Sequence, residues 1–224
     1  MTDRWSKIAP LTGVLFAVVL LGAVFANNSE SPKASASAAR VVAYYSVHRS
    51  EVETSGILFA IAFLVVVLFA GALRSYLRRT PAAEGLSALV LAGAVIMAVG
   101  AIGGTGLEYG LAHNLYDLSP EAVKTLNFIS DELFLPVLAG AFVFGVCSGL
   151  AILRGAALPK WLGWVAIVIG IVTIVPPASM FALLAFIVWT VVVAILMYRR
   201  IGVPAGTVAG AGAGTSPGTP QPVV

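Results

Sequence analysis

The strongest constraint on this chain is a stretch of 38 residues, from Trp161 to Tyr198, that contains no Asp, Glu, Lys or Arg. As one straight helix it would be about 57 Å long, nearly twice the roughly 30 Å thickness of bilayer hydrocarbon. Pro176 and Pro177 lie near its middle, and because neither has an amide donor, they favour the end of one helix and the start of another. The stretch therefore predicts a hairpin of two membrane spans.

Four earlier runs are also uncharged over about the 20 residues that a crossing needs. The six expected spans cover residues 8–26, 56–73, 86–107, 133–153, 161–175 and 178–198. Only 10% of the 224 residues are charged, while 59% are hydrophobic. So little charge argues against a soluble enzyme or a nucleic-acid-binding protein. The sequence thus predicts an all-α fold, a polytopic transmembrane helical bundle formed by residues 1–201.

The distribution of charge predicts the direction of the spans. With the N terminus in the cytoplasm, nine of the 13 Lys and Arg residues fall on the inner segments, where membrane proteins concentrate them. Eight of the ten acids then fall on two outer loops, residues 27–55 and 108–132, or at their edges. We therefore expect a multi-pass protein of the bacterial plasma membrane with both termini cytoplasmic. Residues 202–224, rich in Gly and Pro, predict a disordered cytoplasmic tail.

The first span has a second interpretation. Arg4 and Lys7 precede the apolar run, and Val24 to Ala26 end it with a pattern that also resembles a signal-peptide cleavage site. A signal-peptide core usually has about 7–15 residues, whereas this run has 19. The length favours a retained span, with cleavage as the alternative.

Two helices are predicted within the outer loops. Val41, Tyr45, His48 and Val52 recur at helical spacing, which is typical of an amphipathic helix at the outer membrane interface. Ser119-Pro120-Glu121 provides a capping hydroxyl, a first-turn proline and an acid near the positive end of a helix. A second helix is therefore expected to begin there and to continue into the fourth span.

Five polar residues on the outer side are candidates for ligand binding or proton relay: Glu108, His113, Asp131, Glu132 and His48. An acid at the end of a span is a functional candidate, and histidines with carboxylates can bind a metal, relay a proton or sense pH. The simpler interpretation, which we favour, is that these side chains reach headgroups and water. No catalytic, metal-binding or cofactor-binding motif is present at the required spacing.

Small residues four apart predict where helices pack closely in lipid. Such pairs occur in the third and fourth spans, at Gly100 and Gly104, Gly106 and Gly110, and Gly145 and Gly149. We expect these two spans to form the packing centre of the bundle. The alternative is that the glycines allow the third span to unwind beside a cavity, as in some transporters.

Three short motifs carry a resemblance to a known family. They are Ala43-Tyr44-Tyr45 with His48-Arg49, Leu73-Arg74 with Leu77-Arg78, and the segment from Leu158 to Trp164. With these motifs and its layout, the chain resembles an actinobacterial family of small six-span integral membrane proteins with no assigned activity. The resemblance implies a cell-membrane location and six helices, and it brings no catalytic residues.

The functional expectation is a non-enzymatic one. We expect a small accessory, scaffold or ligand-binding membrane protein, in contact with the bilayer and with a membrane-protein partner or further copies of itself, but not with nucleic acid. One alternative is a small transporter or proton-coupled permease that uses the outer acids and histidines. A second alternative is a membrane metalloenzyme, which requires His48 and His113 to converge.

Overall fold

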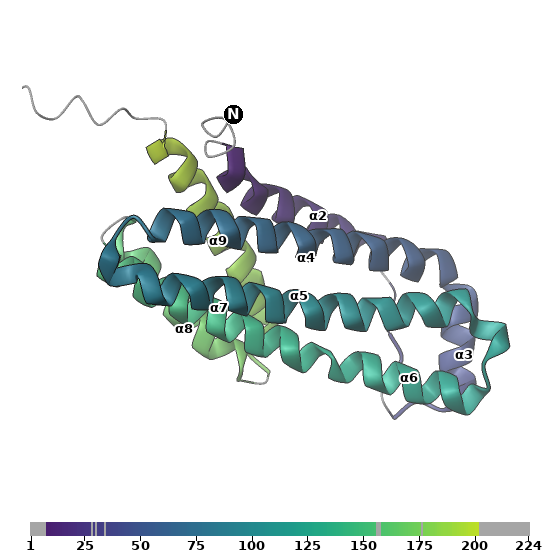
Figure 1. Cartoon of the computed structure of the whole chain (residues 1–224). Helices are drawn as coiled ribbons and strands as arrows, with labels where there is room; N and C mark the ends of the chain where they lie inside the picture. The colour runs from purple at the N-terminus through teal and green to yellow at the C-terminus, as the bar shows by residue number, and fades with distance from the viewer. Residues whose placement is uncertain are drawn as a thin grey trace, which may run out of the picture.

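All regular secondary structure in the described part of the computed structural model is helical (Figure 1), which confirms the predicted all-α class. The described residues are 8–27, 29, 31–33, 35–155, 158–175 and 177–201. The helices are η1 (Ala9–Leu11), α2 (Thr12–Ala26), α3 (Ala38–Val47), α4 (Arg49–Leu77), η2 (Pro81–Ala83), α5 (Glu84–His113), η3 (Leu115–Asp117), α6 (Pro120–Glu132), α7 (Phe134–Gly155), α8 (Lys160–Thr173) and α9 (Ser179–Ile201). The expected disordered tail lies outside the described residues.

Five helical segments in the described part are long and apolar enough to cross a membrane. They are Ala9–Ala26, Arg49–Leu77, Pro81–His113, Pro120–Gly155 and Ser179–Arg200. The sixth apolar helix, α8, has 14 residues and is therefore about 21 Å long, shorter than the hydrocarbon layer. The structure thus contains five candidate spans and one shorter apolar helix.

The helices differ from the expected spans mainly at their ends. Helix α4 begins at Arg49, and α5 continues to His113, so both helices extend into the loops predicted from charge. Ser119 caps α6, since its hydroxyl accepts a hydrogen bond from the amide of Ala122. A single turn residue, Leu133, separates α6 from α7, and the two helices form one helical segment from Pro120 to Gly155, so the helix continues into the fourth span as expected.

The five long apolar helical segments and the shorter α8 form a closed sequence of neighbours. Helix α2 packs on α4, α4 on α5, α5 on α7, α7 on α8 and α8 on α9, and α9 returns to pack on α2. At the closing contact, Gly13 of α2 lies between Phe69 of α4 and Ala194 of α9. The indole Nε1 of Trp189 donates a hydrogen bond of 3.0 Å to the carbonyl of Leu162, which joins α9 to α8. We call this arrangement the helix ring.

Backbone-to-backbone contact of α5 with α7 depends on glycine. A Cβ added at Gly93 would lie 2.6 Å from the amide nitrogen of Phe144, and one added at Gly140 would collide with the backbone of Met97. A Cβ at Gly100 would lie 2.9 Å from the carbonyl oxygen of Leu133. Gly104 faces the end of α6 in the same way. The predicted close approach of the third and fourth spans is therefore present, although Gly93 and Gly140 had not been singled out.

A second glycine face of α7 contacts α8. A Cβ at Gly145 would lie 2.9 Å from the carbonyl oxygen of Ala166, and one at Gly149 would collide with the carbonyl oxygen of Gly163. Because side chains five residues apart on a helix differ by about 140° in direction, Gly140 and Gly145 serve opposite neighbours. Helix α7 is thus held between α5 and α8.

The predicted packing role is wrong for Gly106 and Gly110. A Cβ added at either position would have no neighbour within 4 Å. Gly106 lies two residues after Gly104, so it points about 200° away, to the face of α5 that has no helix against it. The alternative of an unwound third span is also wrong, since α5 is a continuous α-helix from Glu84 to His113.

One end of the molecule carries a small additional lobe (Figure 1). This α3 lobe consists of the connector before α3, α3 itself, the start of α4, the end of α5, η3 and α6. It has its own apolar core, made by Val41, Tyr45, Val52, Leu111, Ala112, Leu115 and Val123. The predicted amphipathic helix is therefore present as α3, but it ends at Val47. Its apolar stripe packs on α6 and α5 and not on the membrane interface.

The opposite end is basic. It contains the end of α4, the end of α7, the start of α8 and the end of α9 (Figure 1). Thr80, between α4 and η2, donates a 3.0 Å hydrogen bond to the carbonyl of Gly155 and thereby fixes two of these segments together. Seven of the eleven Lys and Arg residues described in the structure lie at this basic end: Arg74, Arg78, Arg79, Arg154, Lys160, Arg199 and Arg200.

The glycine contacts lead to a stability prediction. Gly140→Ala should lower stability by about 1–3 kcal/mol, because the new methyl group must displace the backbone of α5. Gly106→Ala is the matched control, and it should be neutral or stabilising by up to about 1 kcal/mol because the site is open and alanine favours helix. Thermal unfolding of the two variants in detergent measures both effects. Equal melting temperatures would contradict the assignment of the α5–α7 contact.

Candidate functional site

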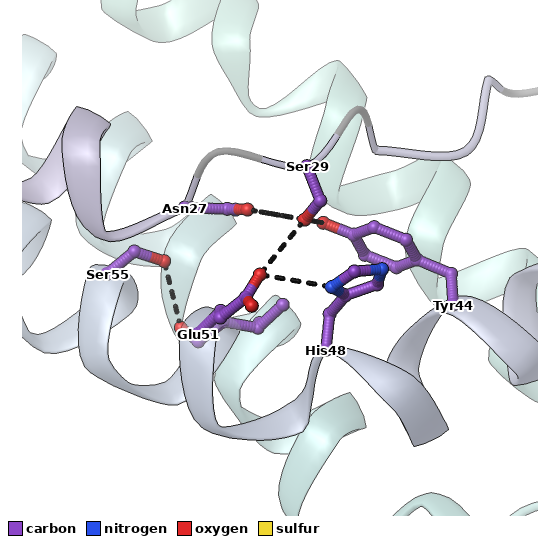
Figure 2. A network of polar contacts seen from close by, with 7 residues as sticks. Asn27, Ser29, Tyr44, His48, Glu51 and Ser55 are labelled. Carbon is purple, nitrogen blue, oxygen red and sulfur yellow. Dashed lines mark hydrogen bonds and ion pairs between the residues drawn. The ribbon is translucent and has the colours of Figure 1, made fainter.

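The first polar network of the α3 lobe is centred on Glu51 (Figure 2). Its carboxylate lies 3.0 Å from Nδ1 of His48 and 3.4 Å from the hydroxyl oxygen of Ser29. Ser29 also donates to the side-chain oxygen of Asn27 at 2.9 Å and lies 3.3 Å from the hydroxyl of Tyr44. Glu51 occupies the first turn of α4, where the positive end of the helix dipole favours an acid. This Glu51 network ties the connector after α2 to the junction of α3 and α4.

A second network is centred on Glu53. Its carboxylate accepts a 3.0 Å hydrogen bond from Nε of Arg49, one helical turn earlier, and lies 3.4 Å from Nδ1 of His113. The ring of Tyr109 stacks on the imidazole of His113, with centroids 5.9 Å apart and planes 7° apart. This Glu53 network therefore joins the start of α4 to the end of α5.

The two histidines of the chain consequently serve different networks. Glu51 and Glu53 are two residues apart on α4, so their side chains point about 200° apart. His48 and His113 bind these separate carboxylates, and neither network contains both. Within the described residues, no three His, Cys, Asp or Glu side chains are arranged to hold a metal ion.

A third group lies beneath α3. Tyr45 is 2% exposed, and its hydroxyl donates a 2.8 Å hydrogen bond to Oδ1 of Asn127 on α6. The amide of Asn127 donates in turn to the carbonyl of Pro32 at 3.4 Å, which fixes the connector before α3. Burial raises the pKa of the Tyr45 phenol, and the nearby carboxylates of Glu108 and Asp131 raise this pKa further. The phenol is therefore kept in its hydrogen-bond-donating form.

Glu108 and Asp131 are the two predicted site residues that the structure brings together. Glu108 is on α5 and Asp131 is on α6, and the two carboxylates interact electrostatically with each other and with Tyr45. Glu132 is exposed beside Asp131. His113 and His48 are placed elsewhere in the lobe, in the two networks on α4. The predicted candidates therefore share one lobe without forming one site.

Several polar residues of the lobe are not among the five candidates chosen from the sequence. Glu51 lies three residues after His48, and Glu53 lies four residues after Arg49. Both separations are typical of side-chain pairs on one helix face, and this spacing would have identified them. Tyr45 and Asn127 are 82 positions apart, and nothing local in the sequence relates them.

The tip of the lobe exposes apolar surface. Val47, the last residue of α3, is 75% exposed, and Tyr116, in the middle of η3, is 82% exposed. Helix α3 contacts η3, so the two side chains belong to adjoining elements. Asp117 follows Tyr116 directly, Glu121 comes four residues later, and both are also exposed. We call Val47 and Tyr116, with these two acids, the lobe tip.

Comparison of the chain with protein-family models, with curated proteins and with solved structures gives no match. The resemblance to the six-span actinobacterial family therefore stays a prediction. Inferences about function rest on the geometry of the chain itself.

The buried Tyr45 hydrogen bond gives a prediction for the lobe. Tyr45→Phe should cost about 1–3 kcal/mol, because it leaves the buried amide oxygen of Asn127 without a donor. Tyr116→Phe removes a hydroxyl from an exposed ring and should change stability by less than about 0.5 kcal/mol. Thermal unfolding of the two variants in detergent compares them. A Tyr45→Phe protein as stable as the Tyr116→Phe protein would show that the α3–α6 bond does not hold the lobe.

Proposed function

We propose that this chain is an accessory membrane protein that crosses the plasma membrane six times and binds a partner protein through the tip of an extracytoplasmic α3 lobe. The single observation that supports the docking role most directly is the exposure of Val47 and Tyr116 on a lobe that has a core of its own. Isolated apolar residues on a surface need no explanation. A tyrosine and an aliphatic side chain on adjoining elements, bordered by charge, have the composition of a protein-binding hot spot.

Charge supports the proposed orientation. The basic end has seven bases and one acid, Glu84, among the described residues, whereas the α3 lobe has four bases and seven acids there. Lys and Arg concentrate on the cytoplasmic side of membrane proteins. The α3 lobe then faces outward, and both chain termini lie inside. The surplus of acids further indicates a partner whose contact surface is basic, since complementary charge steers association.

The sixth crossing in this proposal is made by α8. Trp161 and Trp164 at its start are 56% and 62% exposed, and tryptophan is enriched at membrane interfaces. Its packing on α7 and α9 makes α8 a member of the helix ring, which supports a sixth crossing. A helix of 14 residues can cross where the bilayer thins locally or where the adjoining turn lies within it.

The first span is also proposed to be retained. Phe16 of α2 is 1% exposed, and its ring packs edge-to-face on Phe63 of α4 with centroids 6.1 Å apart. Together with the contact of Gly13 with Phe69 and Ala194, this gives α2 an integral place between α4 and α9. Removal of a cleaved leader would expose these apolar surfaces.

Transport is the second candidate function, and one observation favours it. The carboxylates of Glu108 on α5 and Asp131 on α6 interact electrostatically where the lobe meets the helix ring. Paired acids at the end of spans can take part in proton relays. The docking role is preferred because the remaining predicted relay residues, His48 and His113, are held in separate networks on the lobe surface.

Cysteine labelling tests the orientation. Cys147 is the single cysteine and is buried, so Cys147→Ala gives a background without thiols. We expect a membrane-impermeant maleimide to label Tyr116→Cys in intact cells and Ala82→Cys, in η2, only after lysis. A fluorescent protein fused to the C terminus should fold and fluoresce if α8 crosses. Labelling of Ala82→Cys in intact cells would show that the orientation is the reverse of the proposed one. A C-terminal fluorescent protein that does not fluoresce would indicate five crossings.

Photo-crosslinking tests the docking role. A photo-reactive residue at position 116 should give one discrete protein adduct, and the same residue in place of Phe181, which is 75% exposed on α9, should not. The protein identified by mass spectrometry, once purified, should bind the wild-type chain. Tyr116→Ala should weaken this binding about 30-fold, as at a hot spot of about 2 kcal/mol, and Phe181→Ala should leave it unchanged.

Two results would contradict the docking role. One is an adduct at position 116 that contains lipid or a second copy of this chain only. The other is a proton-dependent flux into liposomes that is abolished by Glu108→Gln and unchanged by Tyr116→Ala. That result would favour transport.

A further inference from the structure

Two hydroxyl groups in the middle of the helix ring have no hydrogen-bond partner. Ser148 of α7 and Thr190 of α9 are both 0% exposed, and neither hydroxyl oxygen makes a hydrogen bond. Both residues lie within candidate membrane spans. In hydrocarbon, water is not at hand to satisfy such groups.

Among the described residues, one other buried side-chain atom lacks a partner, Nε of Arg74, whose side chain is only partly buried. The other fully buried polar side chains all have a partner. Four are hydroxyls that donate to a backbone carbonyl three or four residues earlier in the same helix, as Thr173 does to Ile169 at 2.8 Å. The remaining three of these hydroxyls are Ser55, Ser87 and Ser130. Since Ser and Thr in a helix can satisfy themselves in this way, the orientation of Ser148 and Thr190 is an exception that needs a separate cause.

The two exceptional hydroxyls occupy equivalent positions on facing helices. The rings of Phe144 on α7 and Phe186 on α9 pack edge-to-face with centroids 5.2 Å apart. Ser148 follows Phe144 by four residues, and Thr190 follows Phe186 by four. Helices α7 and α9 both end at the basic end of the molecule (Figure 1). Each hydroxyl is therefore one turn, about 6 Å, beyond the phenylalanine contact and within about 40° of the same direction.

The surroundings determine what such a pair can bind. Trp189 packs beside Phe144 and Phe186, its ring centroid 6.2 Å from that of Phe144, and its indole reaches the carbonyl of Leu162 on α8, so large aromatic rings cover the side toward α8. No Asp or Glu is among the fully buried polar residues of the described chain, and a cation would lack a counter-charge in the ring core. A small neutral molecule that both donates and accepts hydrogen bonds fits these conditions.

We propose that Ser148 and Thr190 bind a buried water molecule between α7 and α9. The water accepts from one hydroxyl and donates to the other, or the reverse, and so satisfies two polar groups whose burial without partners would each cost about 1–3 kcal/mol. These helices are not neighbours along the ring and have few contacts with each other. The water therefore gives the centre of the ring a polar link between α7 and α9.

Infrared spectroscopy in lipid nanodiscs tests this proposal. Exchange of the solvent for H₂¹⁸O should shift one O–H stretching band of an ordered water in the wild-type protein. The band should be lost in Ser148→Ala and in Thr190→Val. Thr173→Val is the matched control, because its hydroxyl bonds within its own helix, and it should keep the band. Absence of an isotope-sensitive band in the wild type, or its persistence in both site variants, would overturn the proposal.

Stability gives an independent readout should one variant assemble poorly. If one water bridges the hydroxyls, Ser148→Ala and Thr190→Val should each lower the melting temperature, and the double variant should lose less than the sum of the two single losses. If the hydroxyls are simply buried in a dry core, each replacement should raise the melting temperature and the effects should add. The second pattern would overturn the proposal.

Discussion

The thickness of the bilayer is the constraint from which the rest of this architecture follows. Hydrocarbon of about 30 Å accommodates roughly 20 helical residues, and α5 has 30 while α4 has 29. Each is about 45 Å long. Both helices therefore project about 15 Å beyond the hydrocarbon, and their projecting turns need cover of their own. The α3 lobe supplies it, since Val41, Tyr45 and Val123 bury the projecting turns against α3 and α6. The lobe is thus built on rigid extensions of the spans and is not a loose loop.

Within the bilayer a different interaction decides the packing, because lipid gives apolar helices no hydrophobic reason to associate. Close contact comes from glycine on two faces of α7, with Gly140 against α5 and Gly149 against α8. The remaining closure, α9 on α2, places a third glycine, Gly13, beside bulky Phe69. Polar side chains are few in this interior, so each of them must have a partner. Ser148 and Thr190 stand out for that reason.

Much of the fold could be predicted from the sequence because hydrophobic length is a local property. The places of the apolar helices, the proline break before α9 and the cap at Ser119 all depend on residues within one or two turns. Helix ends were predicted less accurately. An apolar run ends at its first charged residue, whereas the helix continues past it to keep its backbone hydrogen-bonded, as α5 does through Glu108 to His113. The arrangement of the candidate site residues depends instead on the direction in which each side chain points from its helix. Spacing alone does not reveal which face of a helix is covered by a neighbour, and this caused the error at Gly106. It also does not reveal that Glu51 and Glu53 hold the two histidines in separate networks.

The central claim is that α5 leaves the hydrocarbon near Glu108 and continues into the α3 lobe, which lies in water. Spin labels on single cysteines along α5, in the Cys147→Ala background and in lipid vesicles, measure this directly through their relative accessibility to oxygen and to a water-soluble nickel complex. Labels at Leu89 and Val99, which are 48% and 67% exposed in the structure, should be accessible to oxygen only. A label at Tyr109 should be accessible to the nickel complex. A lipid-like signal at Tyr109, or an aqueous one at Val99, would contradict the account.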